Sequence, residues 1–125
     1  MSNETLDDLL ALLLIEGPPG KEAAVAEWIR TRLVEMGVAP GQMAHDRAQE
    51  QSEYGGEVGN LIVHLPGRRA APRLMFSTHM DTVPNAVGCR PRLLREKGRI
   101  VNDAPDRALG GDNRLGCAAL LHLAR

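Results

Sequence analysis

The segment STHMDTVP, residues 77–84, places a histidine and an aspartate two positions apart, directly after the apolar run LMF. Residues two positions apart in an extended chain point to the same side, so His79 and Asp81 share a face. The carboxylate of Asp81 can then hold one imidazole nitrogen of His79 and leave the other nitrogen for a metal ion. An isolated H-x-D pattern is common, however, and by itself it is also explained by a solvated turn.

A second candidate lies in LGGDNRLG, residues 109–116, where glycines flank Asp112. Glycine permits unusual backbone conformations and close approaches. Asp112 directly precedes a predicted helix, so its carboxylate could cap the free amide groups of that helix. The same carboxylate, held in a tight glycine frame, could equally be a cation ligand. Taken alone, this segment leaves both interpretations open.

Two amino-terminal helices are predicted among the elements that position these residues. The first carries a leucine stripe that leaves Asp7 and Asp8 on other faces, and it ends at EGPPG, where Gly17 permits a left-handed cap. Its stripe consists of Leu6, Leu9, Leu10, Leu13 and Leu14. The second helix is predicted from Lys21 to Met36, with Gly37 just past its end.

The strands are predicted from short apolar runs bounded by turn residues. These are residues 60–65 and 73–77, and a hairpin within 90–103 that turns near Lys97–Gly98. The polar, glycine-bearing stretch 41–59 is either a weak edge strand plus a loop or partly mobile. A last helix follows, with one face formed by Leu115, Ala118, Ala119 and His122. We therefore predict an α/β fold with a mixed sheet covered by helices. His79 and Asp81 then lie at the carboxyl end of a strand, where such sheets gather their ligands.

Size and charge limit the alternatives. With 125 residues, of which 43% are hydrophobic, the chain has the size of one small domain. Its net charge of -1 gives no general attraction for nucleic acid or for an anionic membrane. Cys89 and Cys117 do not form a C-x-x-C pair, which favours free thiols in a reducing compartment. The amino terminus is acidic and lacks the basic region of a signal peptide, so we expect a cytoplasmic protein.

Taken together, four segments resemble a known family. They are IEGPPGKEAAVAEWIRTRLVEMG, GNLIVHLPG, STHMDTVP and ALGGDNRLGCAALL, in this order. They are similar to the amino-terminal part of the co-catalytic zinc metallopeptidases that include peptidase T (tripeptidase), carboxypeptidase G, aminoacylase and acetylornithine deacetylase. The resemblance extends over essentially all 125 residues and is strongest toward the tripeptidase-like branch. It implies the amino-terminal part of a zinc-exopeptidase-like catalytic domain.

The resemblance also implies roles for individual residues. His79 matches a histidine ligand of one zinc ion, and Asp81 matches the catalytic aspartate that orients this imidazole. Asp112 matches the carboxylate that bridges both metal ions and is commonly followed by a cis peptide bond. Asn113 stands where many relatives have a second aspartate, which is not a metal ligand. Asn60 matches a recurrent family position without an assigned chemistry.

The implied activity is hydrolysis of a peptide or N-acyl amide bond by a water held between two zinc ions, with a glutamate that moves the proton. By the resemblance, residues 1–125 are a partial catalytic domain that stops before this glutamate and the remaining metal ligands. We therefore expect the chain itself to be inactive and to bind metal weakly. His45, His64 and His122 are expected to be packing or surface residues and not substitute ligands.

Two function classes follow. The chain is either a truncated zinc hydrolase, whose substrate when completed is a small peptide or an N-acyl amino acid, or a non-enzymatic module that pairs with another chain. Removal of the rest of a sheet would expose apolar surface, and this surface could serve a complementing chain or a homo-oligomer. Nucleic acid and membranes are not expected as partners.

Overall fold

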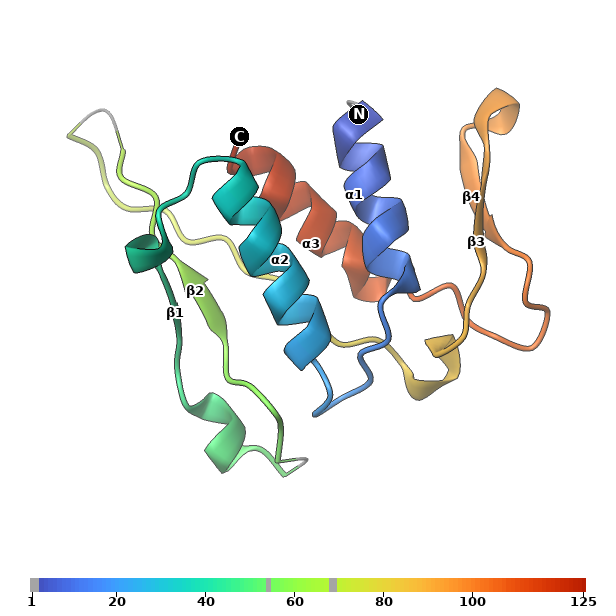
Figure 1. The fold of residues 1–125 in the computed structure, drawn as a ribbon, viewed down its shortest axis with the longest axis horizontal. Coiled ribbons are helices and arrows are strands. Elements are labelled where there is room, and N and C mark those ends of the chain that lie inside the picture. Colours follow the sequence, from blue (N-terminus) through green and yellow to red (C-terminus); the bar gives the residue numbers. More distant parts are fainter. Residues whose placement is uncertain (1–2, 54, 68–69) are drawn as a thin grey trace.

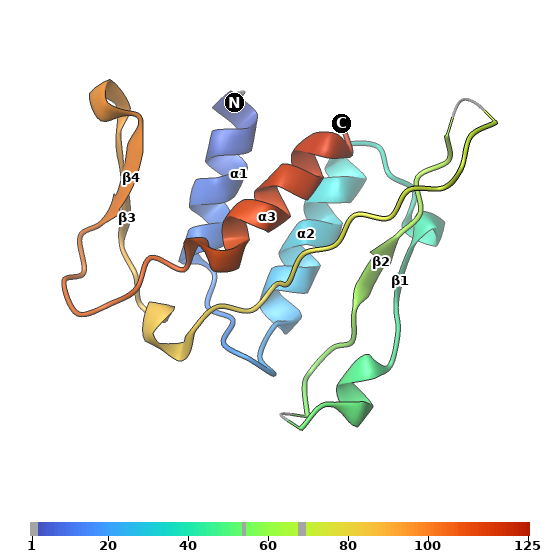
Figure 2. The same ribbon diagram turned by 180° about the vertical axis from the view of Figure 1, so that it is seen from behind.

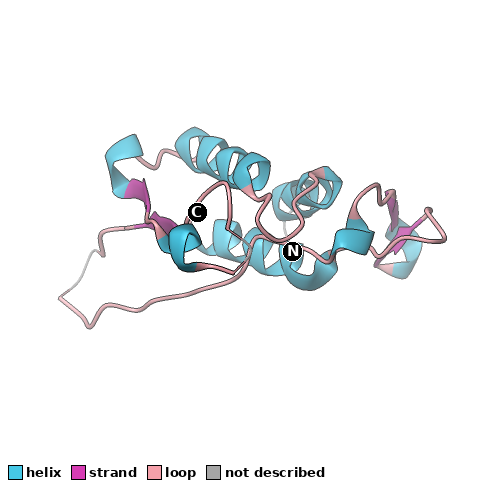
Figure 3. Cartoon of the chain, turned by 90° about the horizontal axis from the view of Figure 1, so that it is seen from below, coloured by secondary structure: helices cyan, strands magenta, loops and turns pink. Residues whose placement is uncertain are grey.

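The computed structural model describes residues 3–53, 55–67 and 70–125. Three helices lie next to one another in the middle of the molecule, with one β-hairpin at each end (Figures 1 and 3). The helices are α1 (Asn3–Leu14), α2 (Ala23–Glu35) and α3 (Gly111–Leu123). The strands are β1 (Met43–His45), β2 (Leu61–Val63), β3 (Pro91–Leu94) and β4 (Arg99–Asn102).

The predicted α/β class is confirmed, but the strands are arranged differently from the expected single mixed sheet. Among the described residues, β1 pairs with β2 and β3 pairs with β4, both antiparallel, in two separate two-stranded sheets. The segment 73–77, predicted as a strand, is extended but pairs with no described strand. In Figure 2 this yellow segment runs past α3 toward the turn that follows it.

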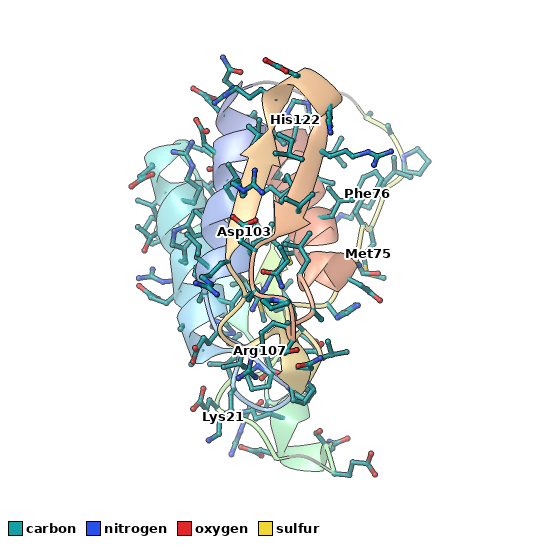
Figure 4. The ribbon with its side chains drawn as sticks, turned by 90° about the vertical axis from the view of Figure 1, so that its right-hand side faces the viewer. Lys21, Met75, Phe76, Asp103, Arg107 and His122 are labelled. Carbon is teal, nitrogen blue, oxygen red and sulfur yellow. The ribbon has the colours of Figure 1, made fainter. Side chains whose placement is uncertain are left out.

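The apolar side chains of this segment face solvent. Leu74, Met75 and Phe76 are 80%, 91% and 63% exposed. Figure 4 shows Met75 and Phe76 at the outer edge of the molecule. A run that is apolar on both faces is typical of a strand covered on both sides. Its local sequence therefore favours a strand, while the neighbours that would complete its hydrogen bonding are not among the described residues.

Helix α1 buries a somewhat different face from the predicted leucine stripe. Leu9 and Leu13 are buried as expected, but Leu12 is also completely buried and Leu14 is exposed. Asp8, which was expected to lie away from the core, is buried as well. Its carboxylate is neutralised by Arg32, at 2.8 Å, and by Arg125, at 2.6 Å. Two cations thus explain a burial that the leucine spacing did not predict.

The ends of the first two helices are set by different glycines. The predicted left-handed cap at Gly17 is wrong, because the first glycine with a positive φ in this region is Gly20. Helix α2 is two residues shorter at its start than predicted, and it ends as predicted with Gly37 at φ 94°. The amide of Val38 donates to Leu33 O at 3.0 Å and that of Gly37 donates to Val34 O at 2.9 Å, as in a Schellman motif.

The core lies between the three helices. Helix α3 contributes Arg114, Cys117, Ala118 and Leu121 to the buried side. The predicted face is therefore wrong in part, because Leu115, Ala119 and His122 are exposed. The small residues Cys117 and Ala118 are the ones that pack into the cluster formed with α1 and α2. Packing against α1 determines which face of α3 is buried, and the periodicity of its apolar residues did not predict that face.

The two hairpins follow the sequence closely. The weak edge strand expected within 41–59 is β1, and the strand expected at 60–65 is the shorter β2. The other hairpin turns at Gly98, whose φ of 57° fits the predicted turn near Lys97–Gly98. Cys89 and Cys117 are free and buried. Within the described ranges, no helix is both long enough and apolar enough to cross a membrane.

Candidate active site

The structure brings together the three side chains that the sequence singled out. His79 lies between two carboxylates: Nδ1 is 3.0 Å from Oδ1 of Asp81, and Nε2 is 3.0 Å from Oδ1 of Asp112. Asp81 is on the same turn as the histidine, whereas Asp112 comes from the start of α3. An imidazole and a carboxylate from two different segments therefore converge on one point.

The charges around His79 favour its protonated form. Partial burial lowers the pKa of His79, but the hydrogen bonds and negative charges of Asp81 and Asp112 raise this pKa more, and the net result is a pKa above the ordinary value. The side chains remain open to solvent: His79 is 50% exposed, Asp81 33% and Asp112 91%. The site is thus a shallow, acidic surface feature.

The turn that carries His79 and Asp81 is anchored at its carboxyl-terminal side. The amide of Thr82 donates to Gly17 O at 3.0 Å, and the thiol of Cys117 donates to His79 O at 3.4 Å. Thr82 is buried. One contact reaches the loop between α1 and α2 and the other reaches α3, so the turn is held even though the segment before it is exposed.

The residues around Asp112 depart from a regular helix. Gly110 has φ 78°, Asp112 and Asn113 have non-helical dihedral angles, and the peptide bond between Asp112 and Asn113 is cis, as the resemblance implied. The side-chain Oδ1 of Asn113 accepts the amide of Gly116 at 2.9 Å. Asn113, not Asp112, therefore caps the helix, and the N-cap interpretation of Asp112 is wrong. The carboxylate of Asp112 is directed to His79 instead.

Gly116 allows the two site segments to pack closely. A Cβ atom at this position would overlap the side chains of Thr78 and Asn113. Thr78 directly precedes His79, so the absence of a side chain at Gly116 permits the turn to lie against the first turn of α3. Neither the capping role of Asn113 nor the contact at Gly116 was predicted from the sequence. The spacing of these residues in GGDNRLG was the signal available for both.

The donor types fit zinc, but their number does not complete a site. Imidazole nitrogen and carboxylate oxygen are both zinc ligands, and a catalytic zinc ion usually takes three protein ligands plus water. In the described part of the chain, no group of three or more His, Cys, Asp or Glu side chains is arranged to hold a metal ion. His79 and Asp112 could therefore form a complete catalytic zinc site only together with further donors.

The other histidines lie elsewhere. The Nδ1 atom of His45 is 3.4 Å from Gly59 O at the edge of the β1–β2 hairpin. The Nδ1 atom of His122 is 3.0 Å from Oγ1 of Thr5. His64 is exposed just after β2. Each position agrees with the expectation of a surface or packing residue.

Asn60 has a structural place away from this site. Its side-chain amide donates to Oδ2 of Asp46 and its backbone amide donates to Oδ1, each at 2.8 Å. A Cβ atom at Gly59 would overlap the backbone of Asp46. These contacts close the end of the β1–β2 hairpin, so Asn60 acts here as a structural residue.

No protein-family model matches the chain. The protein YqjE of Bacillus subtilis strain 168 is 29% identical over 115 residues, which cover 92% of this chain and 29% of that protein. A tripeptidase structure from Staphylococcus aureus subsp. aureus Mu50 has a TM-score of 0.80 at 24% identity, covering 96% of this chain and 30% of its own. Aminopeptidase PepT from Bacillus cereus ATCC 10987 gives 0.81 at 25% identity, covering 97% and 31%.

The likeness to these structures covers nearly all of this chain but less than a third of each compared protein. Only a few per cent of this chain is left out of either match. The fold that the motifs implied is therefore present. In fold, the chain is similar to this tripeptidase and to aminopeptidase PepT, two proteins of the kind that its motifs resemble.

Proposed function

We propose that this chain supplies part of the active site of a zinc-dependent peptidase that hydrolyses peptide or N-acyl amide bonds. The observation that carries the proposal is the placement of His79 between Asp81 and Asp112, each 3.0 Å away. The likeness to a tripeptidase and an aminopeptidase supports the reaction class. The substrate is accordingly a small peptide or an N-acyl amino acid.

In this proposal the three residues have different tasks. Asp81 holds Nδ1 of His79 and fixes the orientation and tautomer of the ring. Nε2 of His79 and the carboxylate of Asp112 would hold the zinc ion, for which Nε2 would have to be unprotonated. Bound zinc would supply a water of lowered pKa and would polarise the scissile carbonyl.

The remaining donors must come from polypeptide other than the described residues. Two ligands are fewer than a catalytic zinc ion normally takes. The chain spans about 30% of the proteins that it matches. We propose that these 125 residues alone bind zinc weakly and do not hydrolyse peptides. The exposed segment of Leu74, Met75 and Phe76 supports completion by further polypeptide, in a longer chain, a complementing chain or a homo-oligomer.

The proposed location is the cytoplasm. Both thiols, of Cys89 and Cys117, are free. Free cysteines are expected in a reducing compartment, where disulfides do not persist. Nucleic acid and membranes are not proposed as partners, because the net charge of -1 offers no general attraction to either.

Zinc titration by isothermal calorimetry tests the ligand assignment. We expect weak binding to the purified chain, loss of this binding in His79→Ala and in Asp112→Asn, and unchanged binding in the control His45→Ala. Zinc should raise the melting temperature only slightly, because stabilisation grows with binding tightness. Equal zinc affinity in His79→Ala and the unmodified chain would contradict the assignment. A large zinc-dependent rise in melting temperature that His79→Ala abolishes would show a more complete site than proposed.

A hydrolysis assay tests the reaction class. Tripeptides and N-acyl amino acids are incubated with zinc and with either the chain alone or a longer polypeptide that contains it. We expect hydrolysis only by the longer polypeptide, with loss of activity in His79→Ala and after removal of zinc by a chelator. Activity of the longer polypeptide that survives both treatments would contradict the proposed function.

A further inference from the structure

Arg114 is a charged residue in the interior of the chain. It is 1% exposed and is one of the largest fully buried side chains among the described residues. Its Nη2 donates to Ile15 O at 2.9 Å, while the buried Nη1 has no partner in the described part of the chain. Burial lowers the pKa of Arg114, whereas the charges of Cys117 and Asp81 act in the opposite direction.

Stability alone does not account for this arginine. A buried guanidinium loses its hydration, and a single carbonyl hydrogen bond satisfies only one of its five N–H groups. Replacing a buried charged group by an apolar one of similar volume is often neutral or stabilising. A methionine would fill much of the same space without an unpaired donor. The residue therefore requires an explanation other than packing.

The contacts of Arg114 connect the segments that form the candidate site. A Cβ atom at Gly17 would be 2.8 Å from Nη2, so the guanidinium lies directly against this glycine. The carbonyl of Gly17 in turn accepts the amide of Thr82, which follows Asp81. The backbone of Arg114 itself is part of the first turn of α3, two positions after Asp112. A cavity of about 40 Å³ beside it is also lined by Ile15 and Thr82.

We infer that Arg114 is a positioning residue, whose guanidinium holds the loop at Ile15–Gly17 against α3 and thereby sets the separation between His79 and Asp112. One end of this connection is the backbone next to Asp112. The other end is the turn of His79 and Asp81, which hydrogen-bonds to Gly17. The chemical use of this separation rests on the proposed zinc-dependent function, but the geometric role does not.

The test compares Arg114→Met and Arg114→Lys with the unmodified chain at one fixed pH. Arg32→Met serves as the control, because Arg32 also ties the core together, through Asp8, but does not contact the site. Three quantities are measured for each: the melting temperature, the ring nitrogen NMR signals of His79, assigned by their loss in His79→Gln, and the dissociation constant for zinc.

A positioning role predicts a specific split between these readouts. Arg114→Met should keep or raise the melting temperature, while its His79 signals move toward those of the exposed His64 and zinc binding weakens about 10- to 100-fold. Arg114→Lys, which keeps the charge but not the forked geometry, should show the same changes to a smaller degree. Arg32→Met should leave the His79 signals unchanged even where its melting temperature falls.

Two outcomes would overturn the inference. One is a folded Arg114→Met chain with unchanged His79 signals and unchanged zinc affinity. The other is a change in the His79 signals that Arg32→Met reproduces at an equal loss of melting temperature, since this would be a general effect of destabilisation. If Arg114→Met does not fold, the comparison is made with Arg114→Lys on the same criteria. Absence of zinc binding in the unmodified chain, with His79 signals that still depend on Arg114, would contradict the weak zinc binding proposed for this chain and leave the positioning role intact.

Discussion

The two segments that form the candidate site are held in different ways. Asp112 lies at the start of α3, a helix that packs into the core and is fixed by the cap at Asn113. His79 follows the extended segment 73–77, whose apolar side chains are exposed, and its turn is anchored by hydrogen bonds at the carbonyl of His79 and the amide of Thr82. The core therefore positions one half of the site directly and the other half through a few contacts at a turn.

This difference separates the requirements for folding from those for function. The helices bury enough apolar surface to hold Asp112 and to anchor the turn of His79. The segment 73–77 adds exposed apolar surface, which is the part of the molecule that further polypeptide would cover. Substitutions in the two regions should accordingly have very different effects on the stability of the chain alone.

The largest contrast is expected between Leu12 and Met75. Leu12 is completely buried in the helical core, so Leu12→Ala should lower the free energy of unfolding by about 2–5 kcal/mol. Met75 is 91% exposed, and Met75→Ala should change the free energy of unfolding by less than about 0.5 kcal/mol. Urea denaturation followed by circular dichroism measures both. A comparable loss of unfolding free energy in the two variants would show that segment 73–77 is packed in solution and not exposed.

Gly116→Ala tests the contact at which the two segments meet. The new methyl group would overlap the side chains of Thr78 and Asn113, and relief of this overlap should cost about 1–3 kcal/mol of stability. Gly111→Ala is the matched control at the start of α3, because a Cβ atom there meets nothing within 4 Å. A Gly116→Ala chain as stable as the Gly111→Ala chain would mean that the turn of His79 does not lie against α3.

The cap at Asn113 should have a smaller effect. Asn113→Ala removes the acceptor of the Gly116 amide and should lower the free energy of unfolding by about 0.5–2 kcal/mol. Asn113→Asp retains an acceptor and should stay close to the unmodified chain. If both variants lose the same stability, the amide of Gly116 is satisfied by another group and the start of α3 is less firmly fixed than described.

The smallest effect is expected at the exposed end of the β1–β2 hairpin. The hydrogen bond from Asn60, followed by those from the amides of Ala48 and Asn60, lowers the pKa of Asp46 below its ordinary value of 3.8. Because the folded pKa is the lower one, this stabilisation is present above the unfolded pKa and is lost as the pH falls through the folded value. Asp46→Asn should therefore flatten the fall in stability between about pH 5 and pH 2. Urea midpoints across this range measure it, and an unchanged slope would contradict the role of the carboxylate.

Local patterns in the sequence predicted much of the fold and the pairing within the site. The spacing of two residues brought Asp81 to His79, and the glycine at position 98 located the second hairpin turn. Long-range contacts were not predictable in this way. The burial of Asp8 depends on Arg125, at the other end of the chain, and that of Arg114 depends on Ile15. Periodicity predicts the apolar face of a single helix. It does not predict which residues from distant parts of the chain will pair when the helices pack.

The thiol of Cys117 offers a way to observe motion at the site without any substrate. It is buried and donates to the carbonyl of His79. Burial raises its pKa, so little reactive thiolate forms while the turn of His79 lies against α3. Alkylation of this thiol by a maleimide would then require a transient separation of the turn from α3. The rate of alkylation of Cys117, compared with that of Cys89, measures how often the turn separates from α3. Completion of the site by further polypeptide should lower this rate.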